Sequence, residues 1–307
     1  KAGNNQPEKV NIRLASDNVY ARQAIKDGVD YLTAASLSPN GERMAVTTRG
    51  EVFNIPVEKG VSKNITRTPG AHEREAQWSP DGKYIAFISD RTGETELYLQ
   101  EDGLGKEPVQ LTKNNDTYIR TFSWSPDAKK LVYTDRQNRI CLLDVASKQK
   151  KVLLQDPLGE PREVSFSPDS KWLTYTRTSE NDFSIVYVYN LETQKEYAVT
   201  DQWYSSSSPV FSTDGKYLIF SSARDFNPTY GQTEWNHVYT RMNGVYLALL
   251  RQDTPSPFLE EDDEVTVQTT EGTKEETSEE DTSVRIDIDG IADRIVKLPP
   301  VSYTHLT

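Results

Sequence analysis

The chain has 307 residues and a net charge of −12, with one cysteine and three histidines. Eleven acidic residues and one lysine between residues 260 and 281 contribute −10 of that charge, so the remainder of the chain is close to neutral. This balance leaves no basic surface of the kind that nucleic-acid binding requires, and no apolar run is long enough to cross a bilayer. We therefore expect neither a nucleic acid nor a membrane as a partner.

One sequence unit recurs five times along the chain. Its clearest copy is Ser79-Pro80-Asp81-Gly82, which follows Trp78 and precedes the apolar run 85–87. The five turns lie near residues 38–41, 79–82, 125–128, 167–170 and 212–215, and successive copies are 41 to 46 residues apart. A period of this length is typical of β-propeller blades, which have four strands each.

The residue types in the unit suit a turn between two buried strands. Serine, proline, aspartate and glycine favour the four positions of a type I turn, because proline presets φ and the polar side chains bond local backbone. The apolar runs after each turn predict strands that are covered on both faces, as happens when blade packs on blade. A third and a fourth strand follow each run, for example at 96–99 and 109–111 in the second copy.

These observations predict an all-β fold, a β-propeller of four-stranded blades with five full blades, part of a sixth and an incomplete ring. The propeller is expected to occupy residues 1–300. A disordered acidic insertion at 254–283 is expected inside the fifth blade, before a strand at Val284–Ile288. Residues 301–307 do not continue a blade, so they are expected to be a non-native tail.

The sequence predicts no catalytic, cofactor-binding or metal-binding residue in this chain. Ser205–Ser208 could be combined with His237 into a hydrolase triad, but the serine run lacks a nucleophile-elbow pattern, and a polar loop entering a strand is favoured. Asp287–Gly290 resembles part of a calcium loop, but the ligand positions fall on arginine and valine. Cys141 lies in an apolar run and is expected to be a buried strand thiol.

Several segments carry a resemblance to known families. The Ser-Pro-Asp-Gly turn and the loop 90–94, Asp-Arg-Thr-Gly-Glu, resemble the TolB and tricorn class of propellers. Longer stretches, at 10–13, 72–74, 78–90 and 222–239, resemble tricorn-type serine proteases, and the resemblance extends to about residue 300. It implies that the blades belong to a seven-bladed propeller and that this chain is a fragment.

The resemblance also implies a function. The parent would be a tricorn-family serine peptidase that degrades peptides in the cytoplasm, with an exported or periplasmic location as the alternative. Its propeller would gate the access of peptides to catalytic domains that are absent from this chain, together with a PDZ-like module. The implied partners are peptide substrates and those missing domains; a homo-oligomer is a further partner that the resemblance allows. No cofactor is implied.

One long loop is the candidate site. The segment from Arg224 to Tyr239 joins two strands that a tight turn could join, and long loops in compact folds are often functional. Two interpretations stay open: the loop shapes a peptide path, or it braces neighbouring domains. The residues proposed for either role are Arg224, Asp225, Tyr230, Trp235 and His237.

Two other identities stay open for the chain as a whole. The blades could form a non-catalytic TolB-like propeller that acts as a protein-binding module. They could also be the propeller of an enzyme of the prolyl-oligopeptidase type.

Overall fold

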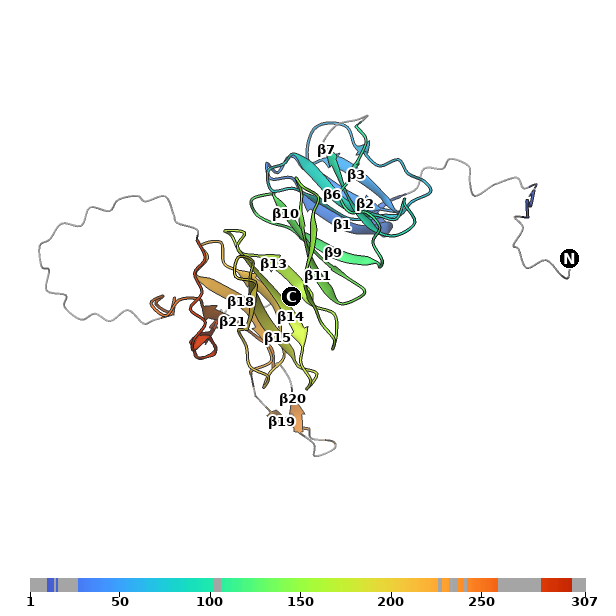
Figure 1. The fold of residues 1–307 in the computed structure, drawn as a ribbon. Coiled ribbons are helices and arrows are strands. Elements are labelled where there is room, and N and C mark those ends of the chain that lie inside the picture. Colours follow the sequence, from blue (N-terminus) through green and yellow to red (C-terminus); the bar gives the residue numbers. More distant parts are fainter. Residues whose placement is uncertain are drawn as a thin grey trace, which may run out of the picture.

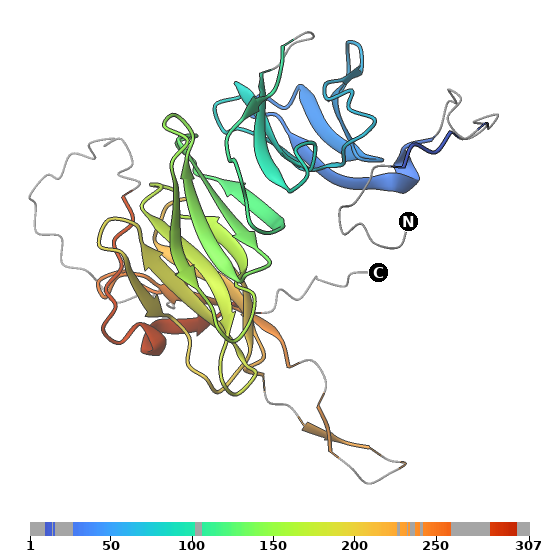
Figure 2. The same ribbon diagram turned by 45° about the vertical axis from the view of Figure 1, so that its right-hand side comes forward.

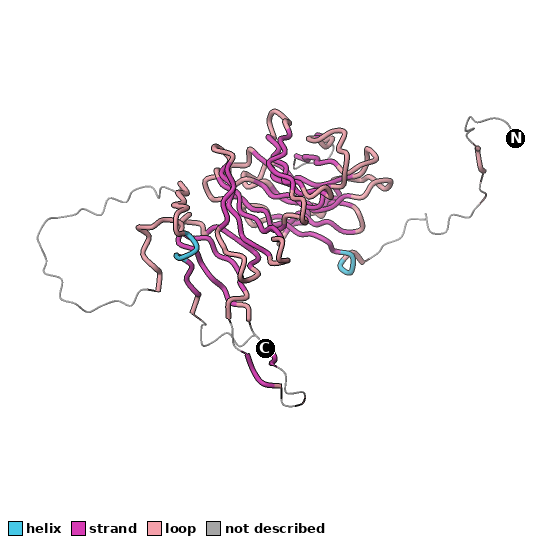
Figure 3. Tube along the Cα trace, turned by 60° about the horizontal axis from the view of Figure 1, so that its bottom comes forward, coloured by secondary structure: helices cyan, strands magenta, loops and turns pink. Residues whose placement is uncertain are grey.

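The computed structural model describes residues 10–13, 15, 27–101, 106–225, 228–231, 233, 237–239, 242–258 and 283–299. These residues form five four-stranded antiparallel sheets and one two-stranded sheet (Figure 1). The described helices are two short 3-10 turns, Val29–Tyr31 and Ile291–Arg294, and neither is long enough to cross a membrane (Figure 3). The predicted all-β fold of four-stranded blades is confirmed.

Each four-stranded sheet is a blade whose strands pair in the order in which they occur along the chain. Blades one and two contain β1 (Leu32–Leu37), β2 (Arg43–Thr48), β3 (Glu51–Pro56) and β4 (Lys63–Asn64), then β5 (Glu73–Trp78), β6 (Tyr84–Ser89), β7 (Glu96–Glu101) and β8 (Val109–Gln110). Blades three and four contain β9 (Ile119–Trp124), β10 (Lys130–Asp135), β11 (Arg139–Asp144) and β12 (Lys150–Gln155), then β13 (Arg162–Phe166), β14 (Trp172–Thr178), β15 (Ser184–Asn190) and β16 (Lys195–Ala198). Blade five contains β17 (Ser206–Phe211), β18 (Tyr217–Ser222), β21 (Gly244–Leu249) and β22 (Ile295–Lys297), and the hairpin β19 (Pro228–Tyr230) and β20 (His237–Tyr239) lies between its second and third strands.

The repeated turn joins the first and second strands of every blade. In blade two the Gly82 amide donates to the Ser79 carbonyl at 2.9 Å, and the Ser79 hydroxyl donates to Asp81 Oδ1 at 2.6 Å. The fourth turn residue is left-handed in each copy, so glycine suits it, but Ala128 and Ser170 also adopt φ of 57° and 60° there. The turn is therefore held mainly by its serine and aspartate.

The core consists of four apolar clusters, and each of them lies between two consecutive blades. Strand β6 shows the arrangement: Ile85 and Phe87 contact blade one, while Ala86 and Ile88 contact blade three. Alternate residues of one strand thus serve two interfaces, which explains why its sequence is apolar without interruption.

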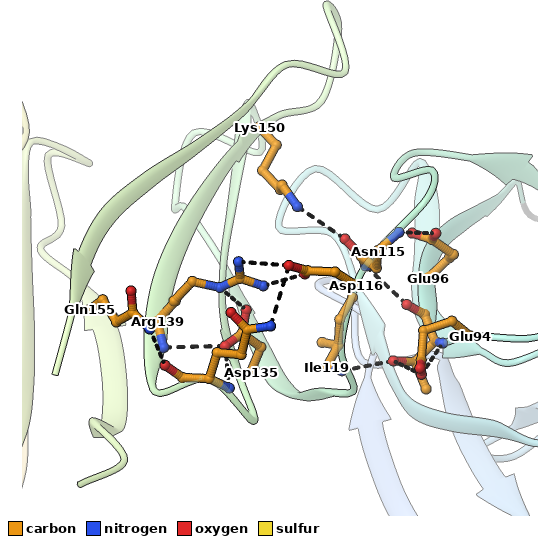
Figure 4. Close-up of polar contacts among 11 residues, drawn as sticks. Glu94, Glu96, Asn115, Asp116, Ile119, Asp135, Arg139, Lys150 and Gln155 are labelled. Atoms are coloured by element: carbon orange, nitrogen blue, oxygen red, sulfur yellow. Dashed lines mark hydrogen bonds and ion pairs between the residues drawn. The ribbon is translucent and has the colours of Figure 1, made fainter. Parts of the chain in front are cut away.

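Polar contacts supplement these clusters where one blade leads into the next. The loop after blade two is held on both sides: the Asn115 backbone N–H donates to Glu96 Oε1 at 2.9 Å, and Arg139 pairs with Asp116 at 2.6 Å (Figure 4). Arg139 also pairs with the buried Asp135 at 2.7 Å. The connection between the two blades is therefore held by a hydrogen bond and an ion pair as well as by apolar contact.

The ring is not closed, and the two end blades each have an uncovered face. On blade one, Leu37 is 56% exposed. On blade five, Val210 and Ile219 are opposite each other on β17 and β18 and are 55% and 38% exposed. The expected part of a sixth blade would follow β22, and the described residues end two positions later, at Pro299.

The acidic insertion is placed inside blade five, because β21 and β22 flank it and pair with each other. The structure describes only 254–258 and Ser283 of the expected range 254–283, and residues 301–307 lie outside the described residues. The expected strand at Val284–Ile288 is wrong. The Val284 amide donates to Asp169 and its carbonyl accepts from the Trp172 indole at 3.2 Å, so the start of this segment is bound to blade four. The rest packs on the cluster between blades four and five and forms no strand with β21.

Candidate functional site

A cavity of about 600 Å³ lies where the first strands of blades one to four converge. The strands β1, β5, β9 and β13 supply most of its wall, so the first strand of a blade is the innermost one. The described lining residues are mostly small, hydroxylic or aromatic: Thr33, Ala34, Ala35, Ser36, Glu75, Ala76, Gln77, Trp78, Ser123, Trp124, Pro126, Ser165 and Phe166. We call this space the axial cavity.

Hydrogen bonds join the innermost strands of blades one, two and three in the wall of the axial cavity. The Gln77 side-chain amide donates to the Phe122 carbonyl at 2.9 Å, which joins blades two and three. The Trp78 backbone amide donates to the Ser36 hydroxyl at 3.0 Å, which joins blades one and two. Polar groups of the innermost strands thus join one blade to the next.

Each innermost strand is interrupted by a change of register with its neighbour. At the interruption in blades two, four and five, the residues Glu75, Glu163 and Ser208 have φ of 55°, 58° and 55°. A left-handed conformation at a non-glycine residue costs about 1 kcal/mol and is often found near functional sites. Such a change of register is a β-bulge, and it alters the direction in which the neighbouring side chains point relative to a regular strand.

Hydrogen bonds join the bulge of blade four, at Glu163, to the bulge of blade five, at Ser208. Glu163 accepts from the Ser208 amide at 2.5 Å and from the Ser208 hydroxyl at 3.0 Å. Within the same serine run, the buried Ser206 hydroxyl donates to Ser222 at 3.0 Å. Ser206–Ser208 therefore belong to strand β17 itself, rather than to a loop that precedes it, and they serve to join strands and blades.

Two of the five proposed site residues hold the base of the β19–β20 hairpin. Asp225 pairs with Lys297 at 2.6 Å and accepts from the Tyr246 hydroxyl at 2.8 Å. These partners lower the pKa of Asp225, Lys297 more than Tyr246. Burial, together with the bond to Asp225, raises the pKa of Tyr246 to about 12. Arg224 lies over the rings of Tyr204 and Tyr246, 5.9 and 5.8 Å from their centres.

Tyr230 and His237 belong to the strands of the hairpin, which projects from blade five (Figure 2). Tyr230 on β19 is 60% exposed and is opposite His237 on β20. Trp235 lies outside the described residues. The structure thus pairs Tyr230 with His237 in the strand register of the hairpin and places Arg224 and Asp225 at the base. Arg224, Asp225 and Tyr230 are not among the described residues that line the axial cavity.

The family resemblance implied an axial channel lined by the inner strands, but sequence reasoning did not name the residues that line it, because they form no motif of their own. The signal that could have found them is the repeat, since the lining residues of β5, β9 and β13 lie within five positions before the turn proline. Among the described residues no group of three His, Cys, Asp or Glu side chains could hold a metal ion. Cys141 is buried, as predicted.

Comparison with known proteins gives one matching family over most of the chain. The family described as the tricorn protease second beta propeller domain matches residues 32–306. Tricorn protease homolog 1 of Streptomyces coelicolor is 25% identical over 96% of this chain and 28% of its own length. The tricorn protease homolog of Saccharolobus solfataricus is 24% identical over 95% of this chain and 25% of its own length. The chain therefore spans about a quarter of these relatives.

Solved structures agree on the fold. The crystal structure of the tricorn protease superposes with a TM-score of 0.71 at 17% identity, over 91% of this chain and 26% of that one. A TolB structure from Agrobacterium tumefaciens superposes with a TM-score of 0.51 at 21% identity, over 71% of this chain and 77% of that one. Both are likenesses of fold.

Proposed function

Because the chain belongs to the family of the second β-propeller domain of tricorn protease, we propose that it is the substrate-gating part of a serine peptidase that degrades peptides. The catalytic serine and its partners belong to domains of the same polypeptide outside this chain. The role of the blades is physical: they surround a passage along the axis that admits an unfolded peptide and excludes a folded protein.

The axial cavity is the observation that carries this proposal. Its walls are innermost strands with small side chains, such as Ala34 and Ser123, and the inter-blade hydrogen bonds of Gln77 and Trp78 hold these strands together. A rigid wall of this kind fixes the width of a passage. An extended peptide, which is one chain thick, fits where a folded domain does not.

The test uses the full-length protein that contains this chain. We expect it to cleave unstructured peptides and to leave folded proteins intact. Replacing Ser123 with tryptophan fills part of the axial cavity, so Ser123→Trp should lower kcat/KM for peptides. Ser62→Trp adds the same volume at an exposed position of blade one that does not line the cavity, and it should leave kcat/KM unchanged.

Two results would count against the proposal in different ways. No cleavage of any peptide by the full-length protein would remove the peptidase role of the parent. Normal cleavage by Ser123→Trp would leave the peptidase and remove the passage through the propeller.

The blade-five hairpin is proposed to assist in one of two ways, by shaping the peptide path or by bracing a neighbouring domain. Its base is fixed by Asp225 and its exposed part carries Tyr230, which suits a contact outside the sheet. The pair Arg224→Ala and Trp235→Ala in the full-length protein separates the two roles. Lost peptidase activity with unchanged stability supports the path, lost stability supports the brace, and no change in either contradicts both.

The second candidate is a non-catalytic propeller that binds a protein partner. It is favoured by the superposition on TolB, which covers 77% of that chain. The coding sequence that follows this chain in its gene separates the two candidates. Serine-peptidase domains support the first, whereas an early stop supports the binding module.

A further inference from the structure

The axial cavity has one charged residue in its described wall. Of the residues that line it, Glu75 alone has an ionisable side chain; the others are neutral. Glu75 is half-buried on the innermost strand of blade two, and the repeated bulge gives it a left-handed φ of 55°. A single negative charge is thus built into an otherwise neutral wall.

The matching residue of blade four shows what such a carboxylate does when it has a structural role. Glu163 stands at the same position of the repeat and binds the next bulge through the amide and hydroxyl of Ser208. The position that matches Ser208 in blade three is Thr121. Between Glu75 and Thr121 the structure has no corresponding hydrogen bond, and Glu75 has no hydrogen-bond or ion-pair partner among the described residues.

The arginine beside Glu75 does not neutralise it. Arg74 Nη2 donates to the Ile119 carbonyl at 2.7 Å, and its guanidinium lies over the Tyr118 ring, 4.3 Å from the centre. Both contacts direct this cation to the start of blade three. The negative charge of Glu75 is therefore left without a compensating charge from its neighbour in sequence.

We infer that Glu75 recognises a positively charged group of a peptide in the axial cavity, either its α-ammonium group or a lysine or arginine side chain. A half-buried carboxylate forms stronger hydrogen bonds to a cation than to a neutral donor, and the neutral wall screens it less than water would. The described wall has no cation to repel such a peptide. This inference rests on the proposed function, because it assigns a preferred substrate to the same passage.

The experiment compares four peptides of one length with the full-length protein. They combine a free or an acetylated amino terminus with lysine or norleucine at one internal position, so each positive charge is removed separately. We expect the wild type to favour the cationic peptides in kcat/KM by about tenfold, as one charge-assisted hydrogen bond allows. If acetylation removes the preference, Glu75 binds the α-ammonium group. If norleucine removes it, Glu75 binds the lysine side chain.

The variants assign the preference to this residue. Glu75→Gln should abolish it, and Glu75→Lys should reverse it in favour of the acetylated norleucine peptide, which carries neither positive charge. Glu180→Gln removes an exposed carboxylate from a blade-four loop that does not line the cavity, and it should keep the wild-type preference. An unchanged preference in Glu75→Gln would overturn the inference.

Two further measurements keep the inference separate from folding and from the proposed function. If Glu75→Gln does not fold, the wild-type preference should still fall as salt is added, and a preference that is independent of salt overturns the inference. If no peptide is cleaved, the proposed function fails, and the binding of the same labelled peptides is measured by fluorescence anisotropy. Equal binding of the charged and neutral peptides then overturns the role of Glu75.

Discussion

Arg177 of β14 forms an ion pair of 2.6 Å with Asp156, a carboxylate in the connection from blade three to blade four whose side chain is completely buried. The same guanidinium pairs with Glu196 of β16 at 2.7 Å and lies over the Tyr187 ring, 5.2 Å from its centre. One cation thus joins the connection, the second strand and the last strand of blade four.

Removing that cation should destabilise the fold strongly. Arg177→Met leaves the buried Asp156 without its cation and with the Leu158 backbone amide as its hydrogen-bond donor, and the loss of one member of a buried pair typically costs about 3 kcal/mol or more. Urea unfolding followed by tryptophan fluorescence measures the change. Lys171→Met breaks the exposed pair with Glu192 and should cost at most about 1 kcal/mol. Equal losses in the two variants would contradict the role of Arg177.

Removing the hydroxyl of the turn serine should lower the free energy of unfolding, although the side chain is small. The Ser79 hydroxyl donates to Asp81 and accepts from the Tyr84 amide at 3.0 Å, so Ser79→Ala removes two bonds in a buried place. We expect a loss of about 1 to 2 kcal/mol in the free energy of unfolding. Ser62→Ala, at an exposed position of blade one, should change the same measurement by less than about 0.5 kcal/mol.

Acid should loosen the base of the blade-five hairpin. Lys297 and Tyr246 hold the pKa of Asp225 below its usual value, so the stability that this carboxylate provides is present above the unfolded pKa. That stability is lost as pH falls through the lower, folded pKa. The urea midpoint should therefore fall less in Asp225→Asn than in the wild type, between about pH 5 and about pH 3.

The control for this pH dependence is Asp289→Asn. Asp289 is exposed in the turn before the last 3-10 helix, and its substitution removes a carboxylate without touching the hairpin base. It should reproduce the wild-type response to acid. If Asp225→Asn and Asp289→Asn respond alike, the contacts of Asp225 do not contribute to the acid sensitivity.

Cys141 should be unreactive in the folded protein. Burial raises the pKa of this thiol to about 11, so near pH 8 it is both protonated and shielded from solvent. A chromogenic disulfide reagent should label it only after unfolding in denaturant. Ser62→Cys supplies an exposed thiol for comparison and should react at once; rapid labelling of Cys141 in the wild type would contradict the buried position.

The sequence was sufficient to predict the blades but not all of their strands. The turn serines and the apolar runs repeat with a fixed period, so the first three strands of a blade follow from local pattern alone. In blade five the alternation of Val284, Ile286 and Ile288 predicts a strand. The structure instead packs these side chains into the apolar cluster between blades four and five, and it forms the last strand from Ile295–Lys297, a run too short to stand out.

The two candidate sites, the long segment after Arg224 and the axial cavity, also differ in how far the sequence predicts them. The long segment after Arg224 is visible in the sequence because it departs from the repeat. The residues that line the axial cavity cannot be picked out there, since residues such as Ala34, Gln77 and Ser165 come together only when four blades pack side by side. Whether Glu75 has a hydrogen-bond partner in the next blade depends on Thr121, 46 positions away in the sequence. The local sequence around Glu75 cannot predict this.

The four apolar clusters, one per junction of consecutive blades, give the described chain the energetics of a linear array. Its stability is then close to a sum of terms for single blades and for nearest-neighbour contacts. Blades one and five each have one such junction, and the inner three have two. Unfolding should therefore begin at both ends and move inward, and the amides of β10 and β11, in the middle blade, should exchange their hydrogens last.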